Sequence, residues 1–204
     1  MKTKIFKKAA RAITGIIAVA ILLSAPQLLK AQGNYKLVAA KDVAVKVLGS
    51  SNVHDWVMTA TGLESQGEFK FDAQNELTGL TSLNFSVDVK SLKSEHASMD
   101  DRTYKTISAD KYPKVVYKLT SATVTTTAKG KYLIKTKGEL TIAGVTQPIS
   151  MDVNAVLNAD NSISCTGSEK LKLTDYKIDP PSFLLGAMKV TNDLTIQFNL
   201  LFKK

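Results

Sequence analysis

Two histidines are the residues of this 204-residue chain best suited to acid–base or metal chemistry, and they stand far apart in the sequence. His54 precedes Asp55 and Trp56, so this segment could supply half of a catalytic or metal site. No Glu-x-x-His element and no matching cysteine accompanies it, which favours a turn histidine that is hydrogen-bonded to a neighbour. We therefore expect no metal site and no catalytic residue here.

Two adjacent acids, Asp100 and Asp101, are the next candidates for proton chemistry. On a helix, neighbouring residues point about 100° apart, so these carboxylates cannot easily share a proton as a catalytic pair does. Negative charge near a helix N-terminus is the simpler interpretation. The sequence has no glycine-rich phosphate loop, nucleophile elbow or Cys-x-x-Cys motif. The chain is predicted not to be an enzyme; the alternative requires that His54 finds a partner in space.

The single cysteine, Cys165, rules out an internal disulfide framework. It belongs to an alternating run whose apolar side includes Ile163 and Leu171, which indicates a buried, unreactive thiol. The other interpretation is a thiol that joins two chains, so a homodimer stays open.

The N-terminus has the pattern of a secretory signal peptide. Five basic residues and no acidic one precede residue 12, and an apolar run follows over residues 12–23. That run is within the roughly 7–15 residues of a signal-peptide core and short of the roughly 20 that span a bilayer. Small residues lead up to Ala31, so we expect cleavage between Ala31 and Gln32. The expected organisation is a cleaved signal peptide over residues 1–31 and one domain over residues 32–204, periplasmic or secreted, with no stable membrane span.

Removal of this leader changes what the charge implies. The whole chain carries 27 Lys+Arg and 18 Asp+Glu, a net charge of +9. The leader holds six of the basic residues, which leaves 21 against 18 and a net charge of +3. We therefore expect no nucleic-acid partner.

Alternation of apolar and polar residues dominates the remaining chain. In one run Leu83, Phe85, Val87 and Val89 face one way and polar residues face the other. This pattern predicts eight or more long strands separated by turn sequences. The runs are residues 35–39, 43–47, 54–60, 67–71, 83–89, 114–120, 132–142, 149–157, 163–171 and 190–202.

Long antiparallel strands with one apolar face must cover that face, either as two packed sheets or as a closed barrel. The strand lengths and short connections favour an all-β, extended eight-stranded antiparallel up-and-down barrel. Thr136 and Gly138 interrupt one bulky inward row, and Gly167 and Glu169 interrupt another. These interruptions fit an internal cavity, and a bulge at either glycine fits equally well.

Residues 94–107 break the strand pattern and predict one short helix between central strands. Ser98 and Asp101 have the spacing of a loose capping box. Met99, Thr103 or Tyr104, and Ile107 share a helical face. Such a helix could be a lid across one barrel end or a plug for the core, and the sequence does not separate the two.

Several segments resemble the YceI-like proteins. Residues 99–104 and 109–113, which lead into Val115-Val116-Tyr117, resemble the family's central signature. Residues 137–149 match its Gly-x-Leu-Thr-Ile-x-Gly-Val-Thr-x-Pro element, and residues 173–178 and 50–56 resemble a late turn and an early variant of exported members. The resemblance implies a lipocalin-like barrel that carries a polyisoprenoid or similar amphiphile. Typical members have His and Arg in the helical segment, where this chain has Asp100, Asp101 and Arg102. They often have an Arg before the late Asp-aromatic pair, where this chain has Leu173 and Thr174, so its ligand is expected to differ at the polar end.

The predicted function is an exported binding protein that carries or sequesters an isoprenoid or other long-chain amphiphile, with no cofactor beyond such a ligand. The alternative is an envelope interaction or stress-protection module with a filled core. The residues expected at the lid or entrance are Met99, Tyr104, Ile107 and Tyr112. The residues expected to line the barrel, each also compatible with an ordinary core, are Trp56, Met58, Phe85, Val87, Tyr117, Ile134, Leu140, Met151 and Phe198.

Overall fold

The computed structural model describes residues 31–204. All of the predicted signal peptide except Ala31 lies outside the described residues. Within residues 31–204, no helix is long and apolar enough to cross a membrane.

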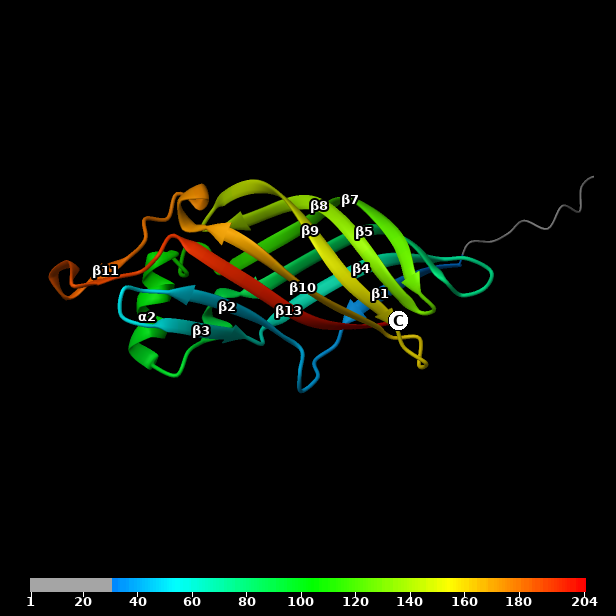
Figure 1. The fold of residues 1–204 in the computed structure, drawn as a ribbon, viewed down its shortest axis with the longest axis horizontal. Coiled ribbons are helices and arrows are strands. Elements are labelled where there is room, and N and C mark those ends of the chain that lie inside the picture. The colour runs from blue at the N-terminus through cyan, green and yellow to red at the C-terminus, as the bar shows by residue number, and fades with distance from the viewer. Residues whose placement is uncertain (1–30) are drawn as a thin grey trace, which may run out of the picture.

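The described chain forms a closed barrel of eight antiparallel strands (Figure 1). Closure comes from the pairing of the first and last strands, where Leu37 lies opposite Phe202. This confirms the predicted fold class. In their order around the barrel, the strands are β1 (Ala31–Leu37), β4 (Leu63–Phe71), β5 (Leu77–Asp88), β7 (Lys114–Ala128), β8 (Lys131–Ile142), β9 (Val145–Leu157), β10 (Ile163–Lys172) and β13 (Asp193–Lys203).

A hairpin interrupts the simple up-and-down order. It consists of β2 (Ala44–Ser50) and β3 (Asp55–Ala60), so β1 pairs with β4 rather than with the next strand of the chain. β2 pairs with one part of β13, and β3 pairs with the short β6 (Leu92–Lys93). The hairpin thus adds to the wall at one end of the barrel, which we call the mouth.

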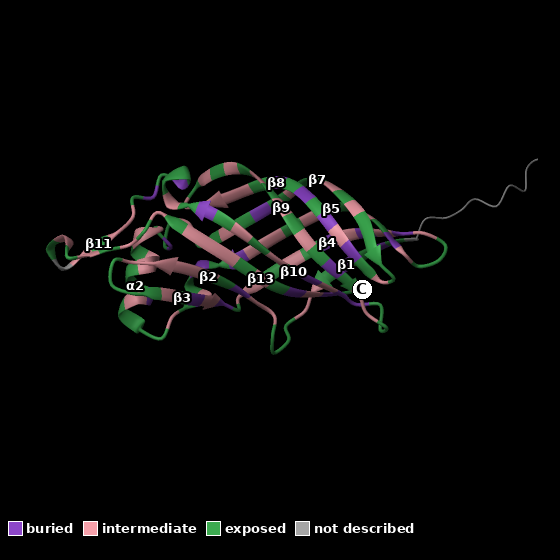
Figure 2. Cartoon of the chain, in the orientation of Figure 1, coloured by how far each residue is buried: buried purple, intermediate pink, exposed green. Residues whose placement is uncertain are grey.

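The strands have the alternation that the sequence predicts. In β8, Tyr132, Ile134 and Thr136 are buried while Lys135 and Lys137 are exposed. Figure 2 shows the same alternation of buried and exposed positions along the other strands. Ala143 and Gly144, both with positive φ (49° and 79°), make the two-residue turn between β8 and β9.

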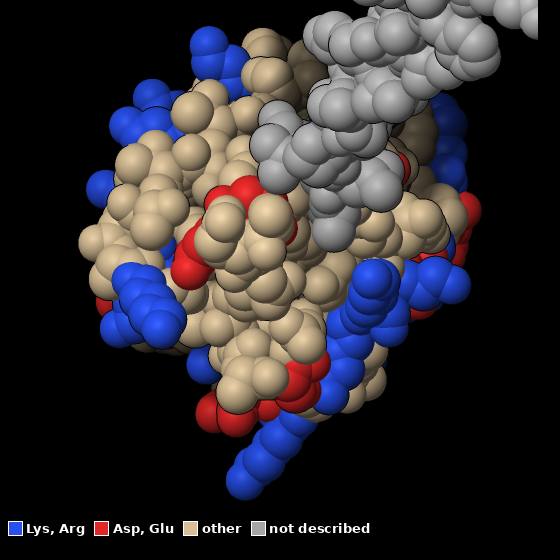
Figure 3. Space-filling view, turned by 90° about the vertical axis from the view of Figure 1, so that its right-hand side faces the viewer, with Lys and Arg blue, Asp and Glu red and all other residues tan. Residues whose placement is uncertain are grey.

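The end of the barrel opposite the mouth is closed by packed aromatic side chains. The ring of Tyr35 lies 5.3 Å from that of Phe69, which lies 5.7 Å from that of Phe202. Tyr132 and Ile163 complete this buried cluster. On the outside of this end, basic and acidic side chains are interspersed (Figure 3), as expected for a solvated surface.

The mouth carries the non-barrel elements (Figure 1). They are the helix α2 (Ala97–Thr106), the short helical turns η1 (Val89–Ser91), η2 (Leu173–Tyr176) and η3 (Leu184–Gly186), and the hairpin of β11 (Ser182–Phe183) and β12 (Met188–Lys189). The predicted helix is present between β6 and β7.

The predicted capping box of this helix is wrong. The helix begins at Ala97, and its N-cap residue, His96, makes no side-chain capping hydrogen bond. Instead, the buried carboxylate of Asp100 accepts hydrogen bonds from the backbone N–H of Ser94 (2.7 Å) and from its hydroxyl (2.8 Å). The Asp100 carboxylate, which holds Ser94 close to the start of the helix, therefore points inward and not to solvent.

Candidate ligand-binding cavity

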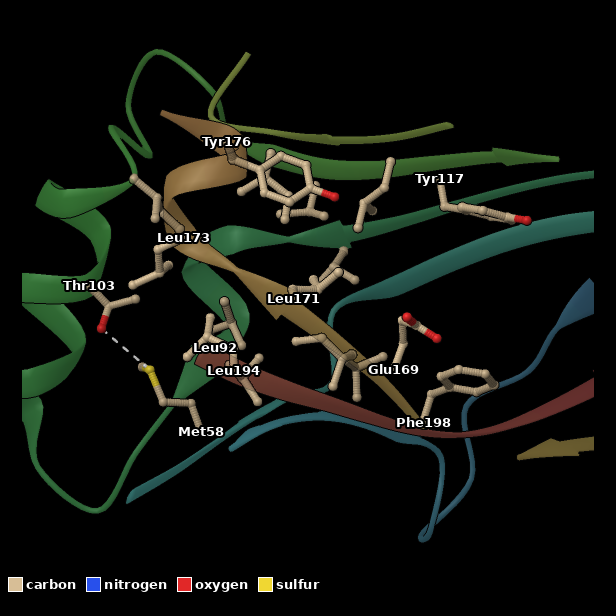
Figure 4. A pocket seen from close by; sticks show the side chains of 18 of the residues that line it. Met58, Leu92, Thr103, Tyr117, Glu169, Leu171, Leu173, Tyr176, Leu194 and Phe198 are labelled. Atoms are coloured by element: carbon tan, nitrogen blue, oxygen red, sulfur yellow. Dashed lines mark hydrogen bonds between the residues drawn. The ribbon is translucent and has the colours of Figure 1, made fainter. Parts of the chain in front are cut away.

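A cavity of about 430 Å³ runs into the barrel from the mouth. This volume lies in the range of small-molecule sites, roughly 300–1,000 Å³. Its lining comes from strands of the barrel, from α2 and η2, and from the β11–β12 hairpin. Aliphatic and aromatic side chains make up most of the wall (Figure 4).

All nine residues expected to line the barrel do line this cavity. The reason is the strand period: inward-facing rows on neighbouring strands converge on one interior. Contact with a ligand stays a prediction for each of them. They are Trp56, Met58, Phe85, Val87, Tyr117, Ile134, Leu140, Met151 and Phe198.

Of the four residues expected at the entrance, Met99 and Ile107 line the cavity. Tyr104 and Tyr112 are not among the lining residues in the described part of the chain, and a role for them at the entrance stays a prediction. The hydroxyl of Tyr104 donates to the backbone carbonyl of Leu92 (2.6 Å) and so fixes the helix to β6. Tyr112 lies against Gly144 at the β8–β9 turn, where an added Cβ would stand 2.5 Å from its ring.

Thr103, the other candidate for the inner face of the helix, does line the cavity. Its hydroxyl donates to Sδ of Met58 on β3 at 3.4 Å (Figure 4). The helix is therefore held over the mouth by contacts on both sides, through Thr103 to β3 and through Tyr104 to β6.

Both glycines that interrupt the inward rows lie under aromatic rings. A Cβ at Gly138 would stand 2.5 Å from the ring of Tyr117, and one at Gly167 would stand 2.3 Å from that of Phe198. A bulge is also present near the first glycine, in β7 between Leu119 and Ser121. β10 pairs through Gly167 without a register shift, so there the ring alone explains the glycine.

A few polar groups lie within the apolar wall. The Tyr117 side chain is 5 % exposed, and among residues 31–204 its hydroxyl has no hydrogen-bond partner. The indole N–H of Trp56 is buried in the same way, with no partner in the described chain. The buried Thr136 hydroxyl donates to the Met151 carbonyl (3.2 Å).

Glu169 is the acidic residue of the wall. It projects inward from β10 beside Phe198 (Figure 4). Burial, followed by the negative charge of Asp152, raises the pKa of this carboxyl above its ordinary value. Burial also raises the pKa of Tyr117, an effect that the neighbouring Thr136 hydroxyl partly offsets. From the sequence, Glu169 was only an interruption of an apolar row, although its inward register could have identified it.

Tyr176 on η2 is a cavity residue that sequence reasoning missed. It is 4 % exposed, and burial, with the charges of Asp175 and Glu169, raises its pKa to about 12. The sequence signal for Tyr176 is its place in residues 173–178, the segment that resembles a late turn of the family.

The mouth is lined by basic and imidazole side chains, namely Arg102, Lys172, His54 and His96. The guanidinium of Arg102 lies over the ring of Phe183, 4.7 Å from its centroid. Both histidines thus line the same cavity although they are 42 positions apart. From the sequence, the two histidines were considered as candidate catalytic or metal residues, and Arg102 only as a position in the helical segment that resembles the family.

His54 follows a tight turn. The Ser51 hydroxyl donates to the His54 carbonyl (3.0 Å) and accepts from its backbone N–H (3.1 Å). This agrees with the turn interpretation of the His54–Trp56 segment. In the described chain, no group of three or more His, Cys, Asp or Glu residues has the arrangement of a metal site.

Cys165 is buried in the wall between Ile163 and Gly167. Burial raises the pKa of its thiol to about 12. The buried-thiol interpretation is therefore correct, and a disulfide between two native chains through this residue would require the wall to open.

Known proteins with similar sequences and structures support the fold. A UPF0312 protein of Vibrio parahaemolyticus is 32 % identical over 120 residues, which cover 55 % of this chain and 60 % of that protein. The chain thus spans less than two thirds of the curated relatives that it matches.

Two solved structures have similar folds at low identity. BcnA of Burkholderia cenocepacia is 18 % identical, with a TM-score of 0.62 and coverage of 78 % of this chain and 99 % of that one. A polyisoprenoid-binding domain from Saccharophagus degradans is 14 % identical, with a TM-score of 0.63 and coverage of 83 % and 97 %. At these identities the similarity concerns the fold.

The sequence matches the YceI-like domain over residues 38–202, which includes almost all of the barrel and the whole lining of the cavity. The segments that carried the resemblance now have positions: one forms α2 and its exit, another forms β8, its turn and the start of β9. This chain belongs to the YceI-like family.

Proposed function

We propose that this protein is an exported carrier, periplasmic or secreted, that holds an isoprenoid or another long-chain amphiphile inside its barrel. The observation that supports this most is the cavity of about 430 Å³, which is apolar over most of its wall and opens at one end. A filled core, as the interaction-module alternative requires, would leave no such space. No catalytic activity is proposed.

The apolar wall supplies the driving force. Burial of a methylene group is worth about 0.8 kcal/mol, so a chain of a few isoprene units is held even after the cost of ordering it. Met58, Met99 and Met151 add flexible side chains that can adapt to chains of different shape. A carrier of this kind needs volume and adaptability more than fixed polar contacts.

Export is supported by the N-terminal pattern of five basic residues and a short apolar run. The first barrel strand begins at Ala31, next to the expected cleavage site. A removed leader would thus cost the barrel at most the first residue of β1. N-terminal sequencing of the protein secreted by its own host tests this, with Gln32 as the expected first residue.

Native mass spectrometry of protein purified from that host tests the carrier proposal. We expect a bound mass that organic extraction releases as a prenyl or long-chain lipid. Protein that arrives empty and takes up no prenyl lipid in vitro contradicts the proposal.

A cavity-filling variant sharpens the test. Met151→Trp places a large ring inside the cavity, whereas Ser150→Trp places the same ring on the exposed outer face of the same strand. We expect loss of the bound lipid only in the first variant. Equal lipid content in both would show that the ligand lies elsewhere.

A further inference from the structure

The β11–β12 hairpin is the outermost element at the mouth end of the molecule (Figure 1). From Ser182 to Met188 its sequence is Ser-Phe-Leu-Leu-Gly-Ala-Met, with no charged residue. Leu185, at the tip, is fully exposed and is not among the residues that line the cavity. A single exposed leucine is ordinary on a protein surface, so its meaning depends on what surrounds it.

A second exposed apolar side chain lies on the neighbouring loop. Among the large hydrophobic residues of the described chain, Leu185 and Val53 (61 %) are the two most exposed. Val53 belongs to the β2–β3 turn, and Asn52 of that turn binds the hairpin. The Asn52 side-chain amide donates to the Ala187 carbonyl (2.9 Å), and its oxygen accepts from the backbone N–H of Lys189 (2.8 Å). Leu185 and Val53, which we call the apolar rim, thus lie on two loops that are fixed to each other.

The backbone at Leu185 is of a kind that leucine seldom adopts. Its φ of 57° and ψ of 31° lie in the left-handed region, which costs free energy for residues other than Gly, Asn and Asp. Gly186, which follows, has a φ of 90°. The turn alone would therefore favour glycine or asparagine at position 185. A leucine that is strained and fully exposed indicates a role outside the fold.

The same hairpin also reaches the cavity. Phe183 and Met188 pair across it, and both side chains line the cavity. The guanidinium of Arg102 over the Phe183 ring connects the hairpin to α2. The hairpin therefore leads from an apolar tip in solvent to the apolar wall inside the barrel.

We propose that the apolar rim docks on the surface of a lipid bilayer, with Leu185 and Val53 inserted among the lipid chains. Cargo then enters or leaves at the mouth without crossing water. The choice of a lipid surface rests on the proposed carrier function, because the amphiphile that such a protein carries resides in membranes.

The size and charge of the rim fit this partner. A stable protein interface takes about 20–30 residues on each side, whereas a few apolar side chains are enough for shallow insertion in a bilayer. The hairpin and the segment before it, residues 177–189, carry two lysines and one aspartate, a net charge of +1. Apolar burial and not charge is therefore the expected driving force.

Flotation with lipid vesicles tests the proposal. The vesicles are phosphatidylcholine alone or mixed with phosphatidylglycerol, and the protein begins at Gln32, so that the apolar leader cannot contribute. We expect wild type to float with both kinds of vesicle. A rise from about 0.1 M to about 1 M salt, which shortens the screening length from about 10 Å to about 3 Å, should not release it.

Leu185→Asn should weaken vesicle binding about tenfold, since burial of a leucine side chain is worth at least this factor. Its melting temperature should not fall, because asparagine tolerates the left-handed backbone. Val53→Thr, which keeps the shape of the side chain, should cause a smaller loss. Val156→Thr is the matched control, since Val156 is an exposed valine of β9 near the opposite end of the barrel.

Three results would overturn the docking proposal. The first is wild type that does not float, or Leu185→Asn that floats as well as wild type. The second is release by salt, which would assign the binding to charged residues. The third is a dimer that forms without vesicles and is lost in Leu185→Asn, which would assign the apolar rim to a second copy of this chain.

Farnesol binding separates docking from the carrier function. Trp56, the only tryptophan, lines the cavity, so its fluorescence reports binding. Leu185→Asn should bind dissolved farnesol with wild-type affinity, because Leu185 is outside the cavity lining, but should take it up more slowly from vesicles. Protein that floats but binds no farnesol would contradict the carrier function alone. Protein that binds farnesol but does not float would contradict the docking alone.

Discussion

Phe198 on β13 lies directly opposite Gly167 on β10, and its ring occupies the space that a side chain at position 167 would need. An added Cβ there would stand 2.3 Å from Cζ of the ring. Because Gly167 has no side chain, the Phe198 ring has room to lie against the wall of the barrel and projects less into the cavity.

Gly167→Ala should therefore be disruptive. The alanine must push the Phe198 ring toward the interior, at a cost of about 1–3 kcal/mol in the free energy of unfolding, and the cavity should hold less lipid. Urea unfolding and lipid content measure the two effects. Gly79→Ala on β5 is the control, because its Cβ would meet only Lys70 side-chain atoms at 3.5 Å or more and should be neutral or stabilising. Equal stability of the two variants would contradict this account.

Asp100→Asn should destabilise the mouth helix and its junction with β6. Burial raises the pKa of Asp100, but hydrogen bonds from the Ser94 N–H and hydroxyl, with Lys93, outweigh burial and leave the pKa below 3.8. The stabilisation is thus present above pH 3.8 and is lost as pH falls through the folded-state pKa. We expect a loss of about 1–3 kcal/mol at pH 7, measured by denaturant unfolding.

Asp101→Asn is the matched control for this change, since Asp101 is exposed on the next position of the helix. It should change the free energy of unfolding little. A similar loss in both variants would mean that the Ser94–Asp100 hydrogen bonds do not stabilise the helix.

Glu169→Gln should stabilise the empty protein at neutral pH. Burial, and then Asp152, raises the pKa of this carboxyl above its ordinary value of 4.5, so the folded state is penalised once the group ionises. Wild type should lose stability relative to the variant as pH rises through that raised pKa. The difference in melting temperature should vanish below about pH 4.5.

Calorimetry at pH 4 and pH 8 tests this, with Glu139→Gln as the exposed control. A variant less stable than wild type at pH 8 would show that the surroundings of Glu169 stabilise its ionised carboxylate in the protein without ligand.

Cys165 should be unreactive in the folded protein. Burial raises the thiol pKa from 9.0 to about 12, which lowers the thiolate fraction at pH 8 about a thousandfold. Iodoacetamide labelling should be slow in buffer and fast in urea. Val53→Cys in a Cys165→Ser background is the control, since position 53 is 61 % exposed and should label rapidly when folded. Rapid labelling of native Cys165 would reveal an opening of the wall that the packed structure does not predict.

Much of this fold could be predicted from period-two alternation, because the sequence of a single strand is enough to identify its inward-facing residues. In β8 these include Ile134, Thr136 and Gly138. The nine lining residues follow from the same rule. What alternation could not show is which rows meet. The β2–β3 hairpin, inserted between β1 and β4, depends on pairing between distant segments, as does the presence of both His54 and His96 in the lining of one cavity.

The details of the helix depend on packing in the same way. Thr103 and Tyr104 differ by one position, and only packing against β3 and β6 decides which of them faces the cavity. Ser98 has the right spacing for a cap, but the Ser94–Asp100 hydrogen bonds form instead, since the buried side of the helix start faces β6. Tyr117 was placed correctly as a lining residue, whereas its unpaired hydroxyl follows only from the surroundings of the folded chain.

The last strand has three partners. β13 pairs with β10 along one edge, and with β2 and then β1 along the other, so the C-terminal residues hold together both ends of the wall. Contacts between segments so distant in sequence slow folding, since a long loop must be closed before they form. The barrel can close only after its final ten or so residues are available, and a chain still being synthesised holds its apolar rows uncovered until then. Folding of the barrel is thus expected to be a single late event, set by the arrival of β13.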